Sequence, residues 1–69
     1  MTPDQMIGYN LKRIREQQGL SQDKLGKLLG YSQNQVSRYE QAGNIKACQL
    51  ILYSAILNTP IEEFYRIPE

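Results

Sequence analysis

Residues 22–41, QDKLGKLLGYSQNQVSRYEQ, contain two short apolar-periodic segments separated by a Gly-Tyr-Ser turn. Gly30 supplies the positive φ that a sharp turn between two helices needs. The stretch therefore predicts two short helices joined tightly, with the rest of the chain holding that pair in shape. The apolar positions that share a helical face are Leu25, Leu28 and Leu29 in the first segment, and Val36 and Tyr39 in the second.

The predicted helices have recognisable starts and ends. Thr2, Pro3 and Gln5 form a capping box with proline at the first helical position, and Ser32 with Gln35 predicts a second box. Ser21 is a cap for the helix that contains Gly26, where glycine costs about 1 kcal/mol relative to alanine. That cost predicts a close crossing at Gly26, the alternative being a tolerated surface glycine. The first helix presents Ile7, Leu11, Ile14 and Gln18, with Met6 beside them, and ends at Gly19.

A fourth helix is predicted from about Ile45 to Leu57, apolar on more than one face, as suits a central helix. Cys48 is expected in the core as a small hydrophobe. Residues 59–62, Thr-Pro-Ile-Glu, predict a third capping box that opens a short fifth helix through Phe64 or Tyr65, followed by a tail at 67–69. The expected inward residues of the fourth helix are Leu50, Ile51, Tyr53 or Ser54, and Leu57.

These elements predict an all-α, compact five-helix fold, with residues 1–69 as one domain. A single cysteine excludes a disulfide within the chain and favours a reducing, cytoplasmic setting. The longest apolar stretch, residues 47–57, is too short to span a bilayer, and no signal-peptide pattern is present.

The charges are unevenly distributed. Between Lys12 and Lys46 there are seven bases and three acids, whereas the remaining residues carry one base and four acids. This asymmetry favours a basic face and an acidic far end, the alternative being chance clustering on a solvated surface.

The outward face of the third helix is unusual for a surface helix. On a helical wheel Val36, Tyr39 and Glu40 point one way, and amides, a hydroxyl and one arginine point the other. Amides pair with adenine and arginine with guanine, so such a face suits the major groove of DNA. The outward residues are Asn34, Ser37, Arg38 and Gln41, with Gln33 and Gln35 on the flanks.

Enzyme chemistry has little support in the sequence. There is no histidine, no metal-ligand spacing, no phosphate-binding glycine loop and no carboxylate pair beside a nucleophile, so no catalytic residue, metal or cofactor is expected. RNA binding is also disfavoured, because the tyrosines fall mostly at predicted core positions of helices rather than on an exposed strand.

From Ile7 to Tyr65 the chain resembles the lambda-repressor and Cro-type helix-turn-helix domains, also called the Xre family. The resemblance rests on the start Gly19-Leu20-Ser21-Gln22, on Gly26 within the second helix, on Gly30 in the turn, on Val36 as the buried β-branched residue, on the ending Tyr39-Glu40, and on residues 57–65 as the last helix.

The resemblance implies roles at matching positions. Base reading falls to Gln33, Asn34, Ser37 and Arg38, and Gln22 is expected to bond a phosphate and brace Gln33. Arg15 and Glu40 match a partly buried salt bridge, with the arginine near a phosphate. Further phosphate contacts are expected from Ser32, Gln35, Asn44 and Lys46, although residues 42–46 lack the proline and one residue found in many relatives.

The leading hypothesis is a sequence-specific, double-stranded-DNA-binding transcriptional regulator, a repressor of bacterial or phage type. It would act as a homodimer on a palindromic operator, with no small-molecule effector. The rival hypothesis is a protein-interaction module, such as an antitoxin or adaptor, that keeps the same fold. Phe64, Tyr65 and Ile67 would then form a partner surface, a dimer interface or the last core contacts.

Overall fold

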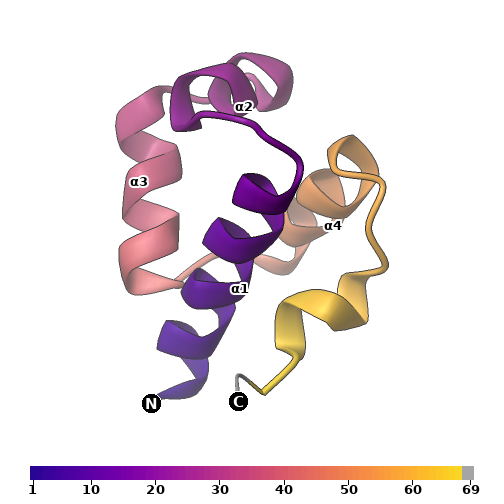
Figure 1. Ribbon diagram of the computed structural model, residues 1–69. Helices are drawn as coiled ribbons and strands as arrows, with labels where there is room; N and C mark the ends of the chain where they lie inside the picture. The colour runs from indigo at the N-terminus through magenta and orange to yellow at the C-terminus, as the bar shows by residue number, and fades with distance from the viewer. Residues whose placement is uncertain (68–69) are drawn as a thin grey trace.

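The computed structural model describes residues 1–67, which form four α-helices and one 3-10 helix (Figure 1). The bounds are α1 Pro3–Gln17, α2 Gln22–Leu29, α3 Gln33–Ala42, α4 Ala47–Ile56 and η1 Ile61–Tyr65. This part of the chain contains no strand, so the all-helical prediction is confirmed. The count of five α-helices is wrong by one, because the last helix has 3-10 geometry. Pro68 and Glu69 of the predicted tail lie outside the described residues.

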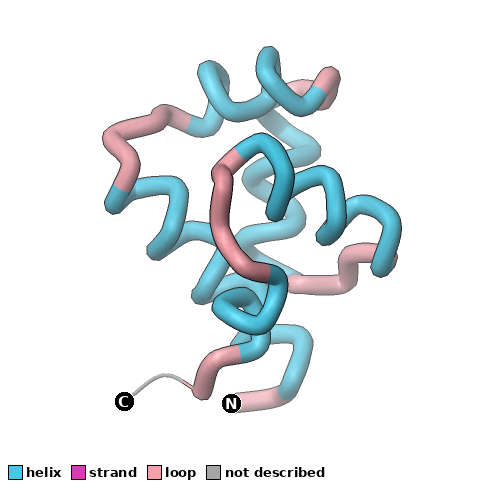
Figure 2. Tube along the Cα trace, turned by 90° about the vertical axis from the view of Figure 1, so that its right-hand side faces the viewer, coloured by secondary structure: helices cyan, strands magenta, loops and turns pink. Residues whose placement is uncertain are grey.

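Helix α1 lies at the centre of the arrangement (Figure 1). Helix α3 packs on both α1 and α2, and η1 packs back on α1. Short loops join the helices, and both ends of the described chain lie on one side of the molecule (Figure 2). Because α3 is held from behind by α1 and α2, its opposite face is left for solvent.

The predicted helix caps form to different degrees. At α1 the box is complete, with Gln5 N donating to Thr2 Oγ1 at 3.1 Å and Thr2 N donating to Gln5 Oε1 at 2.9 Å. Ser21 caps α2 as predicted. At α3 only half of the box forms: Ser32 Oγ accepts from the backbone of Gln35, whose side chain turns away to Tyr39.

The capping box predicted at residues 59–62 is absent. The hydroxyl of Thr59 donates to the Leu57 carbonyl at 2.9 Å instead of accepting from η1. Pro60 precedes η1, and Glu63 N bonds to Pro60 O at 3.0 Å across three residues. A segment of five residues closed in this way stays a 3-10 turn.

The core is a single cluster drawn from every helix. Its members include most of the residues predicted from helical periodicity, but Leu28 is not among them: 56% of its surface is exposed, because α2 faces inward with Leu25, Gly26 and Leu29. The buried apolar residues are Leu11, Ile14, Leu25, Leu29, Val36, Leu50, Tyr53, Leu57 and Phe64.

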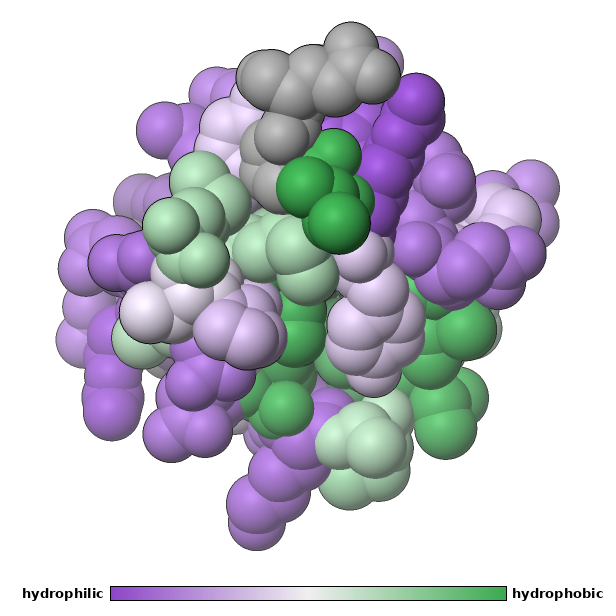
Figure 3. All heavy atoms as spheres, turned by 90° about the horizontal axis from the view of Figure 1, so that it is seen from below, coloured by the Kyte–Doolittle hydropathy of each residue, from purple (hydrophilic) through white to green (hydrophobic). Residues whose placement is uncertain are grey.

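Helix α4 differs most from its prediction. It begins two residues later than expected, and it is peripheral rather than central, since it packs mainly on α2 and η1. Cys48 is therefore exposed, not in the core, and Ile51 is 60% exposed. Tyr53 rather than Ser54 is the buried choice. Hydrophobic side chains also reach the surface among hydrophilic ones on the side of the two chain ends (Figure 3).

Two of the glycines that permit close backbone approach lie within helices. A Cβ at Gly26 would lie 2.6 Å from the Tyr31 carbonyl oxygen, so the predicted close crossing is confirmed. A Cβ at Gly8 would lie 2.5 Å from the Glu40 carbonyl oxygen, where α1 passes α3. Both glycines are buried. Gly26 lets α2 lie against the turn that follows it, and Gly8 lets α1 lie against α3.

Four aromatic rings link the turn, α3, α4 and η1. The ring centroids of Tyr31 and Tyr39 are 6.0 Å apart, and Tyr53 lies 6.5 Å from Tyr31, Tyr39 and Phe64. These spacings suit edge-to-face packing. Among residues 1–67 the buried Tyr53 hydroxyl has no hydrogen-bond partner. Burial raises the pKa of Tyr53 above its ordinary value of 10.0, and the charge of Glu40 adds to that rise.

We expect Tyr53→Phe to stabilise the fold by about 1–3 kcal/mol at pH 7, because it removes a buried polar group without a partner. The raised pKa adds a pH signature. In the wild type the part of the folding stability that depends on neutral Tyr53 is fully present below pH 10.0. It falls as the pH rises above that value, because the tyrosine ionises at lower pH in the unfolded chain than in the folded one. Denaturant unfolding from pH 7 to 11 should show a shallower alkaline loss in Tyr53→Phe; equal slopes would contradict this assignment.

Candidate nucleic-acid interface

Helix α3 separates its polar side chains from its packing side chains. Val36 is fully buried and Glu40 is buried against α1, with Tyr39 half-buried. On the other side Gln33, Asn34 and Arg38 are exposed and Ser37 is half-buried. The outward face of α3 therefore carries two amides, one hydroxyl and one guanidinium.

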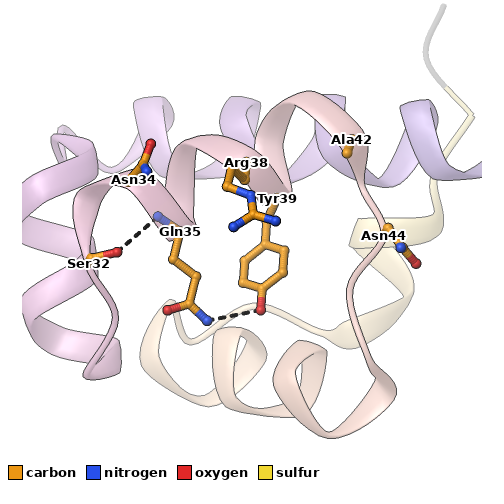
Figure 4. Close-up of a pocket in the computed structure, with 7 residues that line it drawn as sticks. All are labelled: Ser32, Asn34, Gln35, Arg38, Tyr39, Ala42 and Asn44. Carbon is orange, nitrogen blue, oxygen red and sulfur yellow. Dashed lines mark hydrogen bonds between the residues drawn. The ribbon is translucent and has the colours of Figure 1, made fainter.

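Two shallow hollows flank this outward face. One, of about 410 Å³, lies toward α2 and brings Gln22 together with Gln33, Asn34 and Ser37. The other, of about 330 Å³, lies toward the α3–α4 loop (Figure 4). Asn34 borders both hollows, so it stands on the ridge between them. The second hollow is lined by Ser32, Asn34, Gln35, Arg38, Tyr39, Ala42 and Asn44.

The outward groups are largely free to bond a ligand. Within residues 1–67 the side chains of Gln33, Asn34 and Arg38 make no hydrogen bond to another protein group. Ser37 Oγ accepts from Gln41 Nε2 at 3.3 Å, which leaves the hydroxyl proton of Ser37 to donate outward. Such free donors and acceptors are what base edges in a major groove require.

Behind α3 a buried ion pair joins it to α1. Arg15 Nε lies 2.6 Å from Glu40 Oε2, and Arg15 Nη2 lies 3.1 Å from Glu40 Oε1. Arg15 Nη1 also donates to the Leu20 carbonyl at 2.7 Å. The hydrogen bonds to Glu40 raise the pKa of Arg15 above its ordinary value, although burial opposes that rise. The pair fixes the orientation of α3 on the scaffold.

Gln22 completes this network from the start of α2. Its Nε2 donates to Glu40 Oε1 at 3.1 Å, so within the described chain it braces Glu40 and has no hydrogen bond to Gln33. Gln22 and Gln33 still line the same hollow. Helices α1, α2 and α3 thus meet at the carboxylate of Glu40.

The basic residues lie in more than one hollow of the surface, and some of them are paired with acids. Two of the seven between residues 12 and 46 form ion pairs within residues 1–67: Arg15 with Glu40, and Lys27 with Asp23 at 3.3 Å. Lys12 and Arg13 line a separate hollow on α1 that shares no residue with those beside α3. Within α3 the positive charge is that of Arg38, and Lys46 is exposed at the N-cap of α4.

Two polar residues with structural importance escape sequence reasoning. Asn10 is buried in α1, where its Nδ2 donates to the carbonyls of Phe64 at 2.9 Å and Arg66 at 2.7 Å. Gln49 of α4 accepts from Lys46 N at 3.1 Å and donates to the Tyr39 hydroxyl at 2.7 Å. The position of Asn10 beside Leu11 and Ile14 on an apolar helical face is the one sequence feature that indicates its burial.

No group of three or more potential metal-ligating side chains occurs within residues 1–67. In the same range no helix is both long and apolar enough to cross a membrane.

Three comparisons with known proteins agree with this architecture. A helix-turn-helix family model matches residues 11–64. An uncharacterized HTH-type transcriptional regulator of Sinorhizobium medicae (strain WSM419) and another of Rhizobium meliloti (strain 1021) are each 37% identical to this chain over 60 residues. The match covers 86% of this chain but 43% of each relative. The chain belongs to the helix-turn-helix family of the lambda-repressor and Cro type.

Solved structures show the same fold within larger proteins. The crystal structure of FeII HppE matches with a TM-score of 0.86 and 27% identity, over 94% of this chain and 35% of that one. The crystal structure of CoII HppE in complex with substrate matches with a TM-score of 0.84 and 27% identity, over 94% and 37%. Iron, cobalt and substrate belong to HppE, of which this chain spans about a third.

Proposed function

We propose that this chain is a sequence-specific double-stranded-DNA-binding transcriptional regulator that places α3 in the major groove. The observation that carries the proposal is the outward face of α3, where free amide, hydroxyl and guanidinium groups stand without an acidic side chain. The family match and the relatives described as transcriptional regulators support it. The activity needs no catalytic group, metal or cofactor.

In this proposal Gln33, Asn34, Ser37 and Arg38 read the bases. The exposed amides of Gln33 and Asn34 suit the paired donor and acceptor of adenine, and Arg38 suits the two acceptors of guanine. Ser37 donates its remaining hydroxyl proton. Val36 and Tyr39 face the core and hold these four side chains in register.

Phosphate contacts fix the position of the protein but carry no sequence information. Gln22 would make one of them at the edge of the hollow beside α2. Arg15 uses three of its five N–H groups internally, so it contributes mainly its charge. The remaining phosphate contacts are assigned to Ser32 and Gln35 at the start of α3, and to Asn44 and Lys46 in and after the α3–α4 loop.

The proposed mode of action is repression by a homodimer on a palindromic operator. Two copies would place their α3 helices in successive major grooves about 34 Å apart, one helical turn of DNA. A bacterial or phage-type regulator of this kind works in the cytoplasm, where the DNA is. No small-molecule effector site is assigned to this chain.

Selection of bound duplexes from a random pool tests the proposal. The expected result is enrichment of one motif with two-fold symmetry and half-sites about 10 base pairs apart. Recovery of unrelated sequences after repeated rounds would contradict specific readout. Enrichment of a single half-site would support sequence-specific DNA binding but contradict the homodimer.

Exposed apolar side chains give one observation in favour of the protein-interaction alternative. Ile51, Tyr65 and Ile67 are 60%, 46% and 78% exposed, whereas Phe64 is fully buried and belongs to the core. An antitoxin or adaptor would use exposed apolar side chains of this kind to bind a second protein. Sedimentation of the chain with and without DNA, and with proteins from its host, separates the two: a stable protein partner without DNA binding would favour the adaptor.

A further inference from the structure

The hydroxyl of Tyr39 lies at the hollow between α3 and the α3–α4 loop (Figure 4). It accepts two hydrogen bonds, from Gln35 Nε2 at 3.0 Å and from Gln49 Nε2 at 2.7 Å. A phenol has one proton to donate besides its acceptor capacity. Because both bonds use the oxygen as acceptor, the proton of Tyr39 remains for another group.

The orientation of the Gln49 amide is fixed by its other bond. Gln49 Oε1 accepts from the backbone N–H of Lys46 at 3.1 Å, a group that has no acceptor lone pair. The oxygen must therefore face Lys46, and the NH₂ group must face Tyr39. This arrangement prevents Tyr39 from donating to Gln49. Gln35 presents its NH₂ group to Tyr39 in the structure, and in this arrangement no side chain or carbonyl within residues 1–67 accepts from the Tyr39 hydroxyl.

The surroundings of the hydroxyl favour an anion. Arg38 is the charged residue that lines the hollow, and no acid lines it. Asn44 adds an amide from the loop and Ser32 a hydroxyl from the start of α3. The volume of about 330 Å³ is open to solvent on the side of α3 that the proposed DNA contact approaches.

We infer that the Tyr39 hydroxyl donates a hydrogen bond to a phosphate oxygen of the DNA backbone, seated in the hollow between α3 and the α3–α4 loop. The inference rests on the proposed DNA binding and adds a ligand contact from a residue whose ring packs against the core. Gln35 and Gln49 act as positioning residues, because they saturate the oxygen and turn its proton outward.

The first test compares wild type, Tyr39→Phe and the control Tyr9→Phe, whose exposed ring lies on α1, away from this hollow. Each is titrated with the selected duplex and with a scrambled duplex. A hydrogen bond to a charged group predicts a loss of roughly tenfold or more in affinity for Tyr39→Phe. The loss should be equal on both duplexes, since a phosphate carries no sequence. Tyr9→Phe should bind as wild type does.

A scan of single methylphosphonate substitutions then locates the phosphate. At one position, neutralisation should weaken wild type and should remove most of the difference between wild type and Tyr39→Phe. An unchanged affinity of Tyr39→Phe would overturn the inference. A loss that no phosphate position diminishes would also overturn it, because Tyr39 would then act only through the packing of α3. Failure of wild type to prefer the selected duplex would instead refute the proposed function.

Gln49→Glu gives an independent test of the same proton. The carboxylate still accepts from Lys46 N–H, but it also offers an acceptor that captures the Tyr39 proton. Affinity should fall roughly tenfold or more on both duplexes, and by less when the same change is made in Tyr39→Phe, because repulsion by the added charge alone would be equal in both backgrounds. Wild-type affinity in a folded Gln49→Glu variant would overturn the inference.

Discussion

Glu40→Ala is expected to lower the free energy of unfolding by about 3–5 kcal/mol, because it leaves the guanidinium of Arg15 buried without its partner. The Glu40 side chain is 3% exposed and accepts three hydrogen bonds, two from Arg15 and one from Gln22. Loss of this one carboxylate therefore loosens α1, α2 and α3 together. Denaturant unfolding at pH 7 measures the effect.

A control variant and a double variant distinguish the loss of the ion pair from an unspecific loss of stability. Glu62→Ala removes an exposed acid and should change stability by no more than about 0.5 kcal/mol. Arg15→Met combined with Glu40→Leu should recover much of the lost stability, because both charges are then gone. A loss below about 1 kcal/mol in Glu40→Ala would show that the pair does not hold α3. Where Glu40→Ala remains folded, its preference among DNA sequences should be retained.

The double variant Gln33→Ala and Arg38→Ala is expected to lose about 2–6 kcal/mol of discrimination between the selected and the scrambled duplex. Each base contact contributes about 1–3 kcal/mol. Both side chains are exposed, so thermal stability should change little. Arg38→Ala alone should relax the preference at one base pair, as selection with the variant would show.

Lys46→Ala is the matched control for base reading. As a proposed phosphate contact, it should weaken binding equally on all sequences and lower the slope of log affinity against log salt by about one. If Arg38→Ala gave this uniform pattern instead, Arg38 would be a phosphate contact. If the double variant discriminated as well as wild type, the outward face of α3 would not be the reading face.

Most of the scaffold follows from local sequence signals. Thr2 with Gln5, and Ser21, form the caps that their spacing predicts, and Gly30 takes the left-handed conformation at φ 79°. These features depend on interactions within one turn of chain. Besides the capping box at residues 59–62, the predictions that failed concern tertiary position: Leu28 and Cys48 lie on apolar-looking segments but are exposed within residues 1–67. Periodicity finds an apolar face without showing how much of it is covered.

The candidate site also contains some features that the sequence predicts and others that it does not. The outward direction of Asn34, Arg38 and Gln41 follows from helical geometry once α3 is placed. The bond from Gln22 to Glu40, and the contact of Gln49 with Tyr39, join residues 18 and 10 apart across different helices. No spacing rule anticipates such contacts, because they depend on how the helices cross. The hydroxyl of Tyr39 shows the consequence: its ring was predictable, and the direction of its proton was not.

The central claim is that α3 reads base sequence. It is tested most directly by competition between the selected duplex and its scrambled counterpart at two salt concentrations. We predict that the selected duplex binds at least about 10³-fold more tightly, and that raising the salt weakens both complexes without removing this preference. Equal affinity for the two duplexes, with binding abolished by a modest increase in salt, would contradict the account.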